Sequence, residues 1–70
     1  MTARQVLRAL RRAGWHRHSQ VGSHVTLKHP DRPGARVTVA VHPGETLKPA
    51  TLKSILEQAG LDAVTFRGLV

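Results

Sequence analysis

Of the five histidines in this chain, His24 directly follows a Gly22-Ser23 pair and begins a segment that alternates between polar and apolar residues. An imidazole exchanges its proton near neutral pH, so it can act as a general base or a general acid. Gly22 has no side chain that would block a phosphate from approaching the turn. These residue types, in this order, make His24 a candidate for proton transfer at a phosphate group.

Chemistry at a phosphate also needs positive charge and N–H donors around the phosphoryl oxygens. The candidates for this support are the backbone N–H groups of Gly22 and Ser23 and the side chains of Lys28 and Arg36. His42 is a candidate acid for the leaving oxygen, provided that it lies opposite His24. The competing interpretation is a solvated surface histidine at 24, a turn residue at 23 and a strand-end histidine with a structural hydrogen bond at 42.

The other histidines are expected at the surface, and no metal site is expected. His16 and His18 could bind a metal together, but the sequence offers them no convincing third ligand. The chain has no cysteine, which excludes a disulfide framework and a cysteine-based zinc site. We therefore expect no cofactor.

The charge balance predicts an anionic partner. The chain has eleven Lys and Arg residues and four Asp and Glu residues, which gives a formal net charge of +7. Nucleic acid is favoured over an acidic protein. Trp15 and Phe66 are the only aromatic residues, which argues against a base-stacking platform and favours contacts with a sugar-phosphate backbone.

The length of 70 residues predicts a single domain over 1–70, with one small core and marginal stability. No apolar run is long enough for a transmembrane helix or a secretory signal, so a cytoplasmic protein without membrane contact is expected. On its own the chain is expected to be a monomer.

Two amphipathic helices are predicted, one near each end of the chain. Thr2 and Gln5 fit a capping box, and Gly14 can end the first helix in a left-handed conformation. Pro49 suits the first turn of the second helix, Gly60 ends it, and Asp62 can cap one further turn. The expected buried positions are Ala3, Val6, Leu7, Leu10 and Ala13 in the first helix and Leu52, Ile55, Leu56 and Ala59 in the second. The outer face of the first helix carries Arg4, Arg8, Arg11 and Arg12 without an acidic residue, as either a solvated stripe or a binding surface.

Three strands are predicted between the helices, over residues 15–20, 23–29 and 36–42. Val25 and Leu27 alternate with His24 in the second strand, and the valines alternate with polar residues in the third. The order α-β-β-β-α indicates an α+β fold, with two helices on one face of a three-stranded antiparallel sheet. The opposite face stays open and carries His24, Thr26, Lys28, Arg36, Thr38 and His42.

The register between the second and third strands is left open by the sequence. Residues that share a face must lie opposite one another, so the paired residue numbers must add up to an even number. One register places His24 opposite His42, and the other places it opposite Ala40. The turn between the strands permits both.

These segments together resemble the HicA (YcfA-like) family of mRNA interferase toxins over nearly the whole chain. The resemblance rests on Ala13-Gly14-Trp15 after the first helix, Gly22-Ser23-His24, the segment from Val37 to His42 and the segment from Leu47 to Leu61. It departs from the family at Ser19, where an arginine is frequent, and at Ala40, where a proline is frequent.

The resemblance implies a double-stranded-RNA-binding-domain-like fold and metal-independent, ribosome-independent endoribonuclease cleavage of mRNA. It assigns the catalytic role to His24, and it implies a HicB-type antitoxin that covers this histidine in a hetero-oligomer. Two other functions fit the same composition. One is a non-catalytic RNA-binding module in which His24 only contacts the backbone, and the other is an accessory subunit whose basic face docks an acidic protein.

Overall fold

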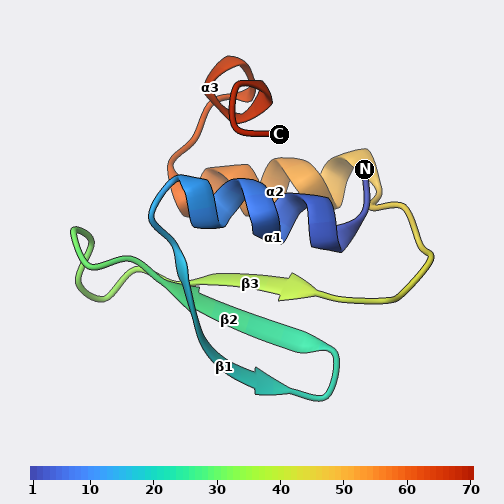
Figure 1. The fold of residues 1–70 in the computed structure, drawn as a ribbon, viewed down its shortest axis with the longest axis horizontal. Coiled ribbons are helices and arrows are strands. Elements are labelled where there is room, and N and C mark those ends of the chain that lie inside the picture. Colours follow the sequence, from blue (N-terminus) through green and yellow to red (C-terminus); the bar gives the residue numbers. More distant parts are fainter.

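The computed structural model describes residues 1–70 and confirms the α+β class and the three-stranded antiparallel sheet. The strands follow the order β1-β2-β3, and the further turn expected after Asp62 is a short third helix (Figure 1). The elements are α1 (Ala3–Arg12), β1 (His16–Val21), β2 (His24–Lys28), β3 (Val37–Ala40), α2 (Pro49–Ala59) and α3 (Ala63–Arg67). None of these helices has the length and apolar character needed to cross a bilayer.

The ends of the helices confirm the predicted caps. The Thr2 hydroxyl accepts from the Gln5 N–H at 3.3 Å, and the Gln5 side-chain oxygen accepts from the Thr2 N–H at 2.8 Å. Gly60 ends α2 with a φ of 68°. The Asp62 carboxylate accepts from the Thr65 N–H at 2.7 Å at the start of α3. Side-chain caps therefore mark the starts of α1 and α3, and a left-handed glycine marks the end of α2.

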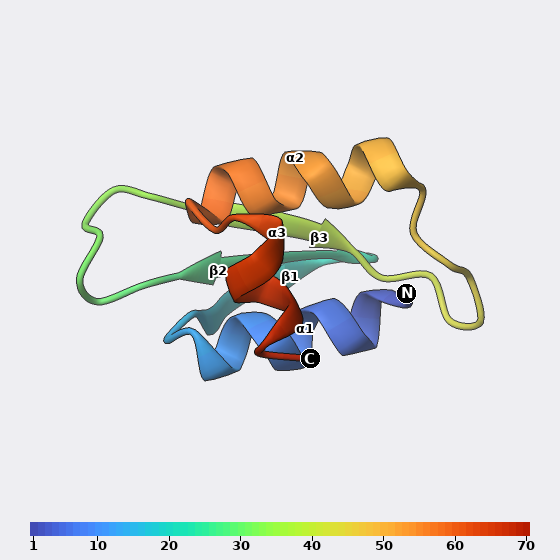
Figure 2. The same cartoon turned by 90° about the horizontal axis from the view of Figure 1, so that it is seen from above.

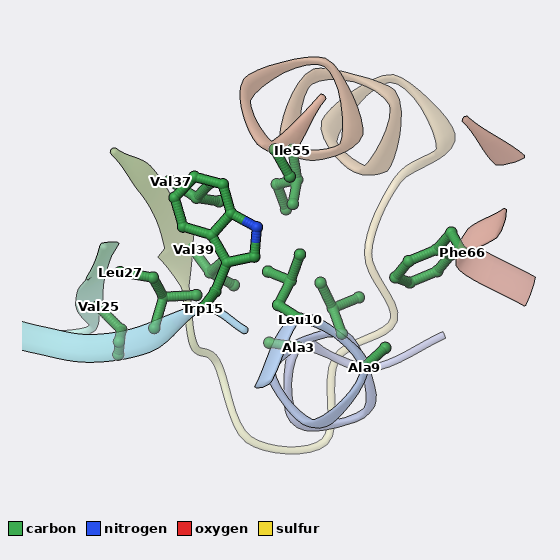
Figure 3. Close-up of a cluster of buried hydrophobic side chains, with 12 residues drawn as sticks. Ala3, Ala9, Leu10, Trp15, Val25, Leu27, Val37, Val39, Ile55 and Phe66 are labelled. Atoms are coloured by element: carbon green, nitrogen blue, oxygen red, sulfur yellow. The ribbon is translucent and has the colours of Figure 1, made fainter. Parts of the chain in front are cut away.

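One apolar cluster of twelve buried residues joins α1, α2, α3 and the sheet. Its members are Ala3, Val6, Ala9, Leu10, Trp15, Val25, Leu27, Val37, Val39, Ile55, Ala59 and Phe66, and most of them are labelled in Figure 3. Of the positions expected to be buried, Leu7, Ala13, Leu52 and Leu56 are only partly so. Ala9 is fully buried in this cluster and was not among the predicted buried positions.

Both long helices pack near β3, and β1 remains an uncovered edge strand. Both helices contact β3, and Figure 1 shows β1 as the strand farthest from them in the sheet. The N–H of Thr38 donates to the side-chain oxygen of Gln58 on α2 at 3.2 Å, so α2 also caps the outer edge of β3. All six residues of β1 are exposed.

His29 is a structural residue and not the surface histidine that was expected. Its Nδ1 accepts from the N–H of Asp31 at 3.1 Å, so Nε2 carries the proton and donates to the carbonyl of Ala13 at 2.9 Å. Its ring also meets Trp15 edge to face, with the ring centroids 5.3 Å apart. His29 thereby joins the end of β2 to the end of α1.

Replacing Gly14 by alanine should reveal the importance of this contact. Gly14 has a φ of 98°, and an added Cβ would clash with the His29 imidazole. Gly34 has a φ of 85° with open space around it, so Gly34→Ala is the matched control. We expect Gly34→Ala to lower the free energy of unfolding by about 1–2 kcal/mol, because of backbone strain alone. Gly14→Ala should cost at least ~1 kcal/mol more, because it also disturbs a hydrogen bond.

Urea unfolding of the two variants and the wild type measures this difference. Equal losses in the two variants would show that the His29 contact contributes nothing to stability.

The cap of α3 predicts a pH dependence of stability. Hydrogen bonds from Thr65, first from its backbone N–H, lower the pKa of the Asp62 carboxyl below its ordinary value of 3.8. A carboxyl whose pKa is lower in the folded state stabilises the fold above its unfolded pKa, and this contribution is lost as the pH falls through the folded pKa.

The variant Asp62→Asn tests this dependence, because it keeps a capping oxygen and does not titrate. The stability of the wild type relative to Asp62→Asn should therefore fall below about pH 4, as thermal unfolding can measure. A difference that stays constant from neutral pH to pH 2 would contradict the role of this carboxylate.

Candidate functional site

His24 is exposed on the face of the sheet that points away from the core, which we call the outer face. It is the first residue of β2, and the buried residues Val25 and Leu27 alternate with the outward residues of the same strand. Because side chains alternate along a strand, burial of Val25 and Leu27 directs His24 outward. The ring of His24 makes no hydrogen bond with another protein group, so both ring nitrogens are free for a ligand.

A two-residue turn, Gly22-Ser23, positions His24 directly after β1. Val21 pairs with His24 across this turn, and Gly22 alone has a positive φ, of 57°, as in a type II′ hairpin turn. The carbonyl oxygens of the turn are occupied: that of Gly22 accepts from the Gln20 side chain at 3.0 Å, and that of Ser23 accepts from the Val41 N–H at 2.7 Å.

The N–H groups of Gly22 and Ser23 donate to no other backbone group. They are therefore free N–H donors in the turn that directly precedes His24. Donors of this kind can stabilise negative charge on a phosphoryl oxygen.

The register of β2 and β3 is the one that places His24 opposite Ala40. Thr26 lies opposite Thr38 on the same face. His42 lies beyond the end of β3 and lines a small hollow with Thr2 and Arg4 at the start of α1. It therefore does not meet the condition on which its role as the leaving-group acid depended.

Lys28 and Arg36 lie at the other end of the strands from His24. Lys28 is four residues along β2, which corresponds to about 13 Å in an extended strand. It lines a hollow of ≈ 440 Å³ with Arg17 and Arg32, near the loop between β2 and β3. Arg36 directly precedes β3, next to that same end. The structure thus brings Gly22, Ser23 and His24 together, and it does not bring Lys28 or Arg36 to them.

A large hollow lies between α1 and β1, and we call it the α1–β1 groove. It measures ≈ 800 Å³ and is lined by Arg4, Leu7, Arg8, Arg11, Trp15, His16, Arg17 and Leu27. The row of arginines on the first helix was visible in the sequence. The contribution of Arg17 was not visible there, because it depends on the placement of β1 next to α1 in the folded chain.

No three potential metal ligands among the His, Asp and Glu residues gather at one place. His16 and His18 lie on β1, and neither has a third ligand beside it.

A comparison with protein families gives one match. The family described as HicA toxin of bacterial toxin-antitoxin matches residues 3–61, which include α1, the whole sheet and α2. His24 and its turn lie inside the matched range. No curated protein matches the chain.

Proposed function

Because this chain belongs to the HicA family of toxins from bacterial toxin-antitoxin systems, we propose that it is an endoribonuclease that cleaves mRNA with His24 as its catalytic base. The observation that carries this proposal is the free, exposed His24 imidazole directly after a turn, Gly22-Ser23, whose two N–H groups are also free. The formal net charge of +7 supports a polyanionic substrate.

The proposed reaction uses the ribose 2′-hydroxyl as an internal nucleophile. The imidazole of His24 takes the proton of this hydroxyl while its oxygen attacks the adjacent phosphorus. The bond from phosphorus to the 5′-oxygen of the next nucleotide breaks, and that oxygen takes a proton from water. The products are a 2′,3′-cyclic phosphate and a free 5′-hydroxyl.

The surroundings of His24 indicate a modest rate. In the proposed mechanism, the backbone N–H groups of Gly22 and Ser23 stabilise charge on the phosphoryl oxygens. The residue opposite His24 on β3 is Ala40, which cannot donate a proton to the leaving oxygen. A single positioned base contributes about 10²–10⁴-fold to a rate, so the enzyme should turn over slowly.

The family implies an antitoxin partner, and we propose that it is of the HicB type and covers the outer face around His24. No helix covers this face, and the neighbouring edge of β1 is free along its length. A partner bound there would exclude RNA from His24 without any change in the toxin. Addition of the antitoxin should therefore stop cleavage, and it should protect the His24 ring from chemical modification.

We expect His24→Ala to abolish RNA cleavage and growth inhibition. The fold should remain intact, because the ring is exposed and makes no hydrogen bond. His18→Ala is the matched control, since His18 is also an exposed histidine on a neighbouring strand. Cleavage of a defined RNA by the purified proteins gives the result, and circular dichroism checks the fold. A His24→Ala protein that cuts RNA at the wild-type rate rules out the catalytic assignment.

Cleavage should continue in EDTA and should leave a 2′,3′-cyclic phosphate, because the proposed route needs no metal ion. Mass spectrometry of the fragments identifies these ends. RNA that stays intact with the wild-type protein would favour the non-catalytic RNA-binding module. Cleavage that stops in EDTA would indicate a metal-dependent nuclease.

A further inference from the structure

The α1–β1 groove concentrates positive charge that no other part of the chain neutralises. Arg4, Arg8 and Arg11 line it from α1, and Arg17 lines it from β1. The chain has four acidic residues, and none of them lines the groove.

These four arginines differ from two others that stabilise the fold. Arg12 donates to the carbonyl of Leu69 at 2.7 Å, and Arg32 donates to the carbonyl of Ala59 at 3.2 Å. The guanidinium groups in the groove donate to no protein group. They are therefore available to an external anion, and an anion bound there would also relieve their mutual repulsion.

The spacing of the arginines fits a linear polyanion. Arg4, Arg8 and Arg11 are four and three residues apart, so they form one row along a face of α1. This row spans about 10 Å along the helix axis, from the rise of 1.5 Å per residue. Arg17 faces the row from the opposite wall. An extended groove with cations on both walls fits successive phosphates better than one small anion.

The floor of the groove argues for phosphate contacts and against a protein partner. Of the three apolar lining residues, Trp15 and Leu27 are 2% and 4% exposed, and Leu7 is half-buried against the core. The groove therefore offers no aromatic surface for base stacking and no large exposed apolar anchor. The large exposed apolar residues are Val21, Val64 and Val70, and none of them lines the groove. The core of a protein interface usually needs such anchors, whereas binding of a nucleic-acid backbone needs only cations.

One end of the groove lies at the same end of the molecule as the turn that precedes His24. The first turn of α1, with Arg4, and the turn between β1 and β2 lie at the same end of the molecule (Figures 1 and 2). A strand that follows the groove toward Arg4 therefore arrives at the end that carries His24. To contact His24, it must then pass around the free edge of β1 to the outer face.

We infer that the α1–β1 groove holds the sugar-phosphate backbone of single-stranded RNA, independently of sequence, and delivers it to His24. This inference rests on the proposed function, because it assigns the groove to the substrate of that reaction. It gives the four arginines a positioning role, distinct from the chemistry at His24.

The test compares Arg8→Gln/Arg11→Gln with the control Arg67→Gln/Lys53→Gln. Both double variants remove two positive charges from exposed helix positions, but only the first removes them from the groove. The probe is a short single-stranded RNA with every 2′-hydroxyl methylated, so that the proposed reaction cannot cut it. Fluorescence anisotropy over a range of salt concentrations measures its binding. The same variants are then assayed for cleavage of unmodified RNA.

The groove variant should bind on the order of 10-fold more weakly at about 0.1 M salt, and its plot of log K against log salt should be less steep by about 1.4. Its cleavage should show a raised KM with little change in kcat, and the control should resemble the wild type.

Equal binding by the groove variant and the control would overturn the inference and leave the role of His24 intact. Normal RNA binding by the groove variant with weakened antitoxin binding would assign the groove to an acidic protein segment. Groove-dependent binding by a wild-type protein that cuts no RNA would refute the proposed nuclease but not the groove.

Discussion

The alternation of side chains along β2 is the constraint on which the rest of this structure depends. Val25 and Leu27 are buried in the only core that a chain of this size forms, so the residues between and before them face outward. The Gly22-Ser23 turn then fixes which outward position comes first, and that position is His24. A shift of one residue would bury the histidine and expose the apolar residues, so the core itself maintains the exposure of the imidazole.

The charge of the protein is divided between structural and free groups. Arg12 donates to the carbonyl of Leu69 near the C-terminus of the chain. Arg32 donates to the carbonyl of Ala59 at the C-terminal end of α2, where a cation is also favourable to the helix dipole. The arginines of the α1–β1 groove bind nothing within the chain. Positive charge of this kind opposes folding through self-repulsion. An anionic partner that binds the folded chain would offset this repulsion and stabilise the small domain.

Sequence reasoning predicted the features that depend on local chemistry. The Thr2 cap, the end of α2 at Gly60 and the cap of α3 at Asp62 each involve residues within a few positions of one another. The exposure of His24 was also predictable, because a strand pattern determines its face. The choice between the two registers was not, since both bury the same valines and differ only in the loop between β2 and β3.

The features that sequence reasoning missed depend on contacts between distant segments. His29 belongs to the structure because β2 ends beside Ala13 and Trp15, and no pattern in the sequence reports that meeting. Lys28 and Arg36 were expected to support His24 because they share its face of the sheet. They lie at the opposite end of the strands from His24, and the alternation of side chains alone does not report that separation. The α1–β1 groove likewise exists only because the folded chain places β1 next to α1.

One measurement addresses the central claim directly: the pH dependence of RNA cleavage, compared with the titration of the His24 ring followed by NMR in the same buffer. If His24 is the base, the rate should rise with pH about the same midpoint at which the ring loses its proton. A rate that ignores that midpoint would contradict the account.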